Sequence, residues 1–457
     1  MSAYRQRYSP RPPAVRAAAA RRQVGERPSP SSRTVADVTG TARAISFLGG
    51  AWIVVIALTP IMRFASVTID SRISLVVLVL AAVSVLAGRV GRPFGGPLWI
   101  IAAVLVLIAG VVAGGQSNAL ASIRVGIEFA AIIGTVPYVL RHFAMTERNW
   151  LRNAVVGFLA VQTISAGAGI LQLWLGLDFW GFAANQGRAN GLSGHPNVLG
   201  IMSTIAFLVL AHILRGSKGR TAFAVILALV VNAGALLATG SLSNMLALAT
   251  GAAVLLIASR STIRTILLTT VGAVLLVPLL GVFGVSISSL TDGVESRIDV
   301  VSGQTGSQGS LEIRQQTWMS AWERIQVDPL LGAGLDSTNQ AVYGTTVVHN
   351  YLLHYWYQGG MSMLVFAVII TLILVALVGR ALIRGREAPQ AAVITAIVTF
   401  AFTSAFYDQQ HYWIPLLVAV AASGPRLSGS HTGLHGRAAP HRARSQPNRP
   451  VEDEGTP

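Results

Sequence analysis

The chain contains no cysteine, a single lysine and very few charged residues. The absence of cysteine excludes disulfides, thiolate metal sites and cysteine nucleophiles. Only 11% of the 457 residues are charged and 53% are apolar, whereas a soluble domain carries about 25% charged residues. The apolar residues gather in runs of about 20, the length of a helix that crosses a bilayer. The composition therefore excludes soluble enzyme folds, and the run lengths exclude an outer-membrane barrel, whose strands have about ten residues.

Two tails without apolar runs flank the hydrophobic part of the chain. Residues 1–43 are rich in Arg, Pro, Ala and Ser, and residues 425–457 are similar, so we expect both tails to be disordered. The segment 44–424 is predicted to be a single all-α, polytopic membrane domain. Its twelve expected spans lie near 44–62, 73–87, 97–115, 121–140, 154–175, 196–214, 221–239, 242–258, 263–284, 348–379, 391–407 and 411–424.

The basic residues give this topology a direction. If both termini are cytoplasmic, the tails and the inner loops hold 27 of the 34 Lys and Arg residues, and the rest of the chain holds seven. This asymmetry follows the positive-inside rule. The same topology places the long loop 285–347 on the outer side. The net charge of +16 is therefore explained by membrane topology, and no nucleic-acid partner is expected.

An outer loop enters the sixth expected span through residues 187–197, Gly-Arg-Ala-Asn-Gly-Leu-Ser-Gly-His-Pro-Asn. Pro196 is favoured at the first position of a helix, and this helix would begin at the outer face with its positive dipole end. Arg188 adds a guanidinium, which matches phosphate geometry. Two interpretations stay open: an anion-binding site, or a glycine-rich turn whose Arg188 reaches lipid headgroups.

Within the long loop, four residues are expected on one packed helix face. They are Arg314, Trp318, Ala321 and Ile325. An arginine on a packed face needs a partner. The sequence offers two, a loop acid such as Asp336 or a bound phosphate.

His349 and Asn350 open the tenth expected span at the outer face. His349 and His354 are five residues apart and point to different faces, so they do not form a helical zinc pair. His349 is either a hydrogen-bonded structural residue or, with its near-neutral pKa, the best candidate for a general base. The turn at 239–244, Thr-Gly-Ser-Leu-Ser-Asn, either contributes hydroxyls to a site or only caps the eighth span.

Two other polar groups lie within or beside the spans. Arg124 and Glu128 are at i and i+4 in the fourth span and are expected to neutralise each other. Ser404, Tyr407 and Asp408 lie near the outer end of the eleventh span. They either line a site or form a polar belt.

The order of these segments, over about residues 150–420, resembles the O-antigen ligase and O-antigen polymerase superfamily of bacterial membrane glycosyltransferases. The resemblance rests on Arg188 through Asn197, the Thr-x-Ser turn at Thr239, Arg314 through Trp318 to Pro329-x-x-Gly-x-Gly, and His349-Asn350 followed by Gly359-Gly360. It implies a GT-C-like helical fold. One position departs from the family pattern, because Leu242 stands where arginine is common after the turn serine.

The resemblance implies transfer of a glycan from a polyprenyl-diphosphate carrier to an acceptor hydroxyl, on the outer face of the cytoplasmic membrane and without a metal ion or other cofactor. By position, Arg188 and Arg314 would hold the donor diphosphate and His349 would activate the acceptor. Supporting roles would fall to Asn197, Ser241, Asn350 and Asp408. The implied partners are the lipid-linked donor, a glycan, lipid or protein acceptor, and the bilayer. From the residues alone, a twelve-span secondary transporter and a non-catalytic scaffold for envelope assembly stay open.

Overall fold

The computed structural model describes residues 45–61, 63–64, 67–68, 70–179, 184, 187–259, 310–336, 341–343, 346–404, 406 and 409–424. The chain divides into two compact units, Met1–Ala42 and Arg43–Pro457, and every described residue belongs to the second. Both expected tails, the ninth expected span at 263–284 and the first part of the long loop lie outside the described residues.

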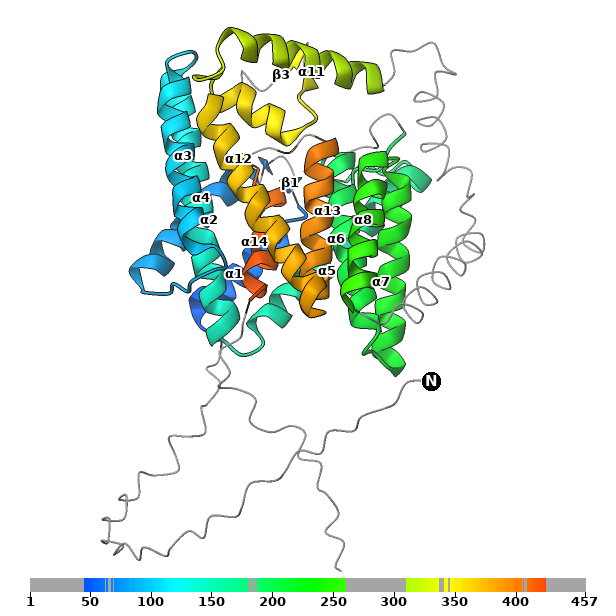
Figure 1. Ribbon diagram of the computed structural model, residues 1–457. Helices are drawn as coiled ribbons and strands as arrows, with labels where there is room; N and C mark the ends of the chain where they lie inside the picture. The colour runs from blue at the N-terminus through cyan, green and yellow to red at the C-terminus, as the bar shows by residue number, and fades with distance from the viewer. Residues whose placement is uncertain are drawn as a thin grey trace, which may run out of the picture. The chain divides into compact units, whose positions relative to one another are not determined.

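Helices dominate the described part of the chain (Figure 1). In chain order they are α1 (Phe47–Leu58), α2 (Asp70–Leu86), α3 (Gly96–Gly114), α4 (Ala119–Thr146), α5 (Trp150–Leu175), α6 (Pro196–Leu214), α7 (Gly219–Ala238), α8 (Leu242–Ser259), α11 (Ser310–Val327), α12 (Tyr351–Arg384), α13 (Ala388–Thr403) and α14 (Gln410–Ala422). Two antiparallel pairs of very short strands accompany them: β1 (Arg63–Phe64) with β2 (Val67–Thr68), and β3 (Ala341–Tyr343) with β4 (Thr346–Val347). The predicted all-α membrane fold is confirmed.

Eleven of the twelve expected spans coincide with a described helix. Seven of these helices, α3 to α8 and α12, are long and apolar enough to cross a membrane. The helices α1, α2, α13 and α14 are shorter, with 12, 17, 16 and 13 residues. At about 1.5 Å per residue, α14 is roughly 20 Å long, which is less than the hydrocarbon core of about 30 Å.

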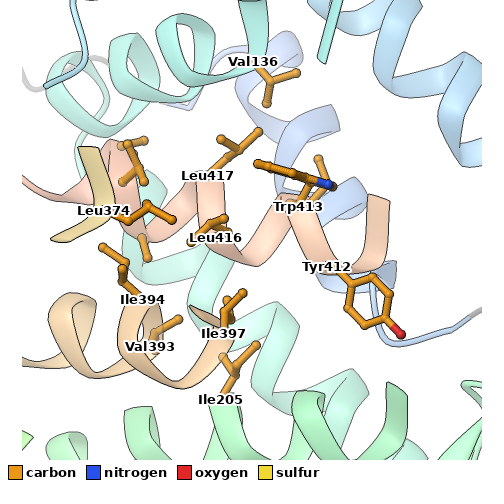
Figure 2. Packing of buried hydrophobic residues seen from close by; sticks show 14 of the residues in the cluster. Val136, Ile205, Leu374, Val393, Ile394, Ile397, Tyr412, Trp413, Leu416 and Leu417 are labelled. Carbon is orange, nitrogen blue, oxygen red and sulfur yellow. The ribbon is translucent and has the colours of Figure 1, made fainter. Parts of the chain in front are cut away.

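The short helix α14 lies in the interior of the bundle. Its side chains Trp413, Leu416 and Leu417 are at most 1% exposed, and Figure 2 shows them between Val136 of α4 and Ile397 of α13. A helix that is apolar all round is stable when protein covers every side. We conclude that α14 contributes to the packed core, in contact with neighbouring helices more than with lipid.

The long helix α12 is interrupted at Gly359–Gly360, where Gly360 has φ 63° and ψ −155°. The loop after α11 covers this break. Three backbone hydrogen bonds join them, from Ala333 N to Tyr357 O (2.8 Å), from Gly334 N to Gln358 O (2.9 Å) and from Met361 N to Leu330 O (3.3 Å). A Cβ atom at Gly332 would lie 2.4 Å from the backbone nitrogen of Gly360. The two glycine motifs of the sequence are therefore parts of one packing unit, which satisfies the backbone groups freed by the break.

Because the helices alternate in direction, the bundle has two ends of different chemistry. The starts of α6, α8 and α12 lie at one end, which α11 crosses (Figure 1). We call this the site end. The opposite end, which we call the basic end, carries Arg89, Arg92, Arg141, Arg148, Arg152, Arg215, Lys218, Arg220, Arg380, Arg384 and Arg386.

Candidate functional site

Arg188 lies in a loop whose backbone is held by buried side chains of α5. Gln172, 1% exposed, accepts hydrogen bonds at Oε1 from the backbone nitrogens of Asn190 (3.0 Å) and Gly191 (2.8 Å). Gly191 has φ 56°, and a Cβ atom there would lie 2.5 Å from Ser165 O. Glycine is therefore required for the loop to approach α5 this closely.

The guanidinium of Arg188 connects this loop to two neighbouring segments. Nε donates to Thr239 O (2.7 Å), in the turn before α8, and Nη2 donates to Asn197 Oδ1 (3.0 Å), in the first turn of α6. The backbone nitrogen of Ala189 donates to Ala238 O (3.0 Å) beside them. These two acceptors fix the orientation of the guanidinium.

Asn244 is fully buried in the first turn of α8. It links the turn before α8 to the start of α6. Its Nδ2 donates to Asn197 O (3.1 Å) and to Ser241 Oγ (3.0 Å). Gly200 makes room for it, because a Cβ atom at Gly200 would lie 2.1 Å from Asn244 Nδ2. The polar groups of the turn therefore join the network around Arg188, and capping of α8 is not their whole role.

Arg314 reaches the same turn from α11. Its Nη2 donates to Ser243 Oγ (3.4 Å), and Ser243 Oγ in turn donates to Thr403 O (2.9 Å) at the end of α13. Arg188 and Arg314 thus contact two parts of one turn, at Thr239 and at Ser243. The two arginines singled out in the sequence are brought together by this turn.

The predicted packed face of α11 is correct at Ala321 and Ile325, which are 0% and 3% exposed, and wrong at Trp318, which is 43% exposed. Thr317 is fully buried instead, and its hydroxyl donates to Arg314 O (2.8 Å). At about 100° per residue, Trp318 lies about 60° to one side of Ala321. The packed face is narrower than the expected one, and it excludes this bulky ring.

His349 lies just before α12, close to Arg314. Its Nδ1 is 2.9 Å from Val347 O. A carbonyl oxygen only accepts, so the neutral ring carries its hydrogen on Nδ1, and Nε2 keeps a free electron pair. The pKa of His349 is lowered to about 4, first by loss of water around the ring and then by the charge of Arg314. The ring is therefore neutral near pH 7, as a general base requires.

His195 is the N-cap residue of α6, and its Nδ1 accepts from the backbone nitrogen of Asn197 (3.1 Å). Its pKa is also lowered to about 4, by loss of hydration, by the charge of Arg188 and by His411. His195 in turn contributes to the lowered pKa of His349. Two neutral histidines thus accompany the two arginines at the site end.

Residues 227–368 match the model of the O-antigen ligase family. This part of the chain is an O-antigen ligase domain. It runs from α7 to the second half of α12 and includes the site residues Ser241, Arg314 and His349. Arg188 and Asn197 precede the domain and are hydrogen-bonded to its turn. No curated protein matches the chain. Over this part the chain is similar to the O-antigen ligases, and seven of its described helices are long and apolar enough to cross a membrane.

Asn197 and Ser241 join the network around Arg188, whereas the other two residues expected in supporting roles, Asn350 and Asp408, have different outcomes. Asn350, within the ligase domain, is the N-cap residue of α12, and its Oδ1 accepts from Leu353 N (3.2 Å). This contact gives Asn350 a structural role. Asp408 lies outside the described residues, so its expected role stays a prediction.

Two further ionic groups were considered from the sequence. Arg124 and Glu128 form the expected ion pair, with Nε 2.8 Å from Oε1. Asp336 is 2% exposed and accepts at Oδ2 from Asn118 N (3.3 Å). Asp336 therefore holds the start of α4, whereas the Arg124–Glu128 pair is a largely exposed contact within that helix.

Sequence reasoning missed Gln172 and Asn244, which shape the site from within the bundle. An amide side chain inside an apolar span was the available signal for Gln172, since such a group is rarely placed in a membrane without a partner. Asn244 stood in the turn 239–244, but its contact with Asn197 joins residues 47 positions apart. No local pattern reveals a contact of that kind.

Proposed function

We propose that the protein transfers a glycan from a polyprenyl-diphosphate carrier to an acceptor hydroxyl, on the outer face of the cytoplasmic membrane. The observation that carries this proposal is the convergence of Arg188 and Arg314 on the turn 239–244, with His349 next to Arg314. Guanidinium groups bind phosphate oxygens in a fork geometry. The positive ends of α6, α8 and α12 face the same end of the bundle and favour an anion there.

In the proposed reaction, the acceptor oxygen attacks the anomeric carbon of the donor sugar. The new C–O bond forms as the bond from that carbon to the phosphate oxygen breaks, and the electron pair stays on the polyprenyl diphosphate. Arg188 and Arg314 stabilise the charge on this leaving group. The hydroxyl proton passes to Nε2 of His349, a step that contributes about 10²- to 10⁴-fold to the rate. Two fixed cations and one base are sufficient for this chemistry.

The outer-face orientation is supported by the basic end of the bundle. Eleven basic residues of the described part lie there, among them Arg89, Arg215 and Arg386. Cytoplasmic loops are enriched in Lys and Arg. With the basic end in the cytoplasm, the site end faces outward, where a flipped lipid-linked glycan is found.

The test is an analysis of envelope glycans in a strain that lacks the protein, with and without a plasmid-borne copy. A ligase predicts full-length chains that accumulate on the lipid carrier, and a polymerase predicts the loss of long chains. The His349→Ala variant, present at the normal level in the membrane, should fail to restore the parent pattern. Unchanged glycans in the deletion strain, or full restoration by this variant, would count against the proposed enzyme and favour a scaffold.

A further inference from the structure

The reaction described above gives no role to His195 at the site end. His195 precedes Pro196 and has the extended backbone of an N-cap residue, with φ −146° and ψ 133°. Its ring nitrogen Nδ1 accepts the hydrogen bond from Asn197 N. Ser, Thr, Asp and Asn are the preferred residues for this task. Capping alone therefore does not explain a histidine here.

The capping bond determines which ring nitrogen carries the hydrogen. A backbone N–H only donates, so Nδ1 of His195 is unprotonated, and the neutral ring carries its hydrogen on Nε2. His349 has the opposite arrangement, because its Nδ1 faces the carbonyl oxygen of Val347. His195 thus presents an Nε2–H donor and His349 presents an Nε2 acceptor.

The ring of His195 also has the right neighbours to contact the donor. Part of the surface of this residue is exposed at the site end. Asn197, whose backbone it caps, accepts from Nη2 of Arg188 (3.0 Å). The N–H edge of His195 and the guanidinium of Arg188 are therefore held in the first turn of the same helix, at its positive end.

We propose that His195 binds the donor diphosphate through its Nε2–H, next to Arg188, as a neutral third donor beside the two guanidinium groups. This inference rests on the proposed function. A neutral donor strengthens as negative charge builds on the leaving group. It also holds the product, polyprenyl diphosphate, less tightly than a third cation would, which favours product release.

Two substitutions separate the capping role of His195 from its donor role. In His195→Asn, the amide oxygen takes the place of Nδ1, so the cap of α6 is kept and the Nε2–H donor is lost. In His195→Gln, the amide nitrogen reaches about the position of Nε2, so a donor is kept, whereas Gln is not among the preferred caps. His195→Asn should therefore cap α6 better than His195→Gln does. Conversely, only His195→Gln keeps a hydrogen-bond donor near the position of Nε2.

The probe is polyprenyl diphosphate without a sugar, bound to the purified full-length protein in lipid nanodiscs, with polyprenyl monophosphate as the reference ligand. We expect His195→Asn to keep the thermal stability of the parent and to bind the diphosphate about tenfold or more weakly, as the loss of a hydrogen bond to a charged group predicts. We expect His195→Gln to bind more tightly than His195→Asn, although its thermal stability is equal or lower.

Binding by His195→Asn at the parent affinity would overturn the inference and leave His195 as a cap. The same conclusion would follow if the affinities of the two variants followed their thermal stabilities. If the parent itself does not prefer the diphosphate over the monophosphate, the proposed function fails, and the role of His195 fails with it.

Discussion

The basic end and the site end of the bundle both contain arginines that are largely removed from solvent, but the arginines have different partners. At the basic end, Arg141 is 7% exposed and donates to Ala421 O (2.8 Å) and Ser423 O (3.0 Å), at the C-terminal end of α14. Arg380 pairs with the carboxylate of Glu387 (2.8 Å). A helix C-terminus carries partial negative charge, and a carboxylate carries a full one. Both partners offset the charge of the arginine.

At the site end, the contacts that orient Arg188 and Arg314 are to a backbone carbonyl, a side-chain amide and a hydroxyl. These groups are neutral, and they orient each guanidinium by hydrogen bonds. The contacts that position the arginines of the two ends therefore differ in kind: they include a helix C-terminus and a carboxylate at the basic end, and neutral polar groups at the site end.

The largest expected difference between the two ends is in the chemical labelling of introduced cysteines. In intact spheroplasts, a cysteine at the site end should react and one at the basic end should not. The chain has no cysteine, so single cysteines can be introduced without a background signal. Asp178→Cys, beyond the end of α5 at the site end, should react with an impermeant thiol reagent in intact spheroplasts. Ser217→Cys, between α6 and α7 at the basic end, should react only after lysis. The reverse pattern would place the site in the cytoplasm and remove the basis for an outer-face reaction.

The next largest effect is expected at His349. Removing the base in His349→Ala should reduce turnover by about 10²- to 10⁴-fold, while the affinity for polyprenyl diphosphate changes little, because Arg188 and Arg314 remain. Turnover and binding are both measured with purified protein. His354→Ala serves as the matched control, since His354 is 1% exposed within α12 and should act through thermal stability. A His349→Ala enzyme with near-parent turnover would remove the base assignment.

Much of the fold was predictable because the signal for a membrane helix is local. The lengths of the apolar runs predicted eleven of the described helices. The burial of α14 was not predictable, because it depends on helices far away in sequence that enclose Trp413 and Leu416. The expected burial of Trp318 was wrong for a similar reason. Helical spacing gives the direction of a side chain, whereas the width of the packed face depends on its neighbour.

The placement of the candidate residues at one end of the bundle was predictable, and their connections were much less so. Topology and helix dipoles pointed to Arg188, Arg314 and His349 as residues of one end. The hydrogen bond from Arg188 to Thr239 O and the link from Asn244 to Asn197 depend on how α6, α7 and α8 pack. The tautomers of the two histidines depend on backbone groups that no sequence motif specifies.

A smaller effect, on the affinity for polyprenyl diphosphate, should follow when arginines of the two ends are replaced by lysine. Arg188→Lys and Arg314→Lys keep a positive charge but lose the planar fork, so the affinity for polyprenyl diphosphate should fall about tenfold in each case. Arg380→Lys is the matched control at the basic end, because its pair with Glu387 tolerates a point charge. It should bind the ligand as the parent does. Equal binding by all three variants would contradict the proposed roles of Arg188 and Arg314.

The smallest expected effect is the change of turnover with pH between about 8 and 5.5. The pKa of His349 is lowered from 6.5 to about 4, by loss of hydration and by Arg314. A lowered pKa keeps the basic form at neutral pH, and at about pH 5 roughly nine tenths of the rings are still neutral. Turnover at saturating donor should therefore be flat over this range and fall only as the pH drops through about 4. An inflection near 6.5 in the parent enzyme would contradict the environment described for His349. Arg314→Gln removes one cause of the lowered pKa, so this variant should move the inflection upward, measured at donor concentrations raised to offset its weaker binding.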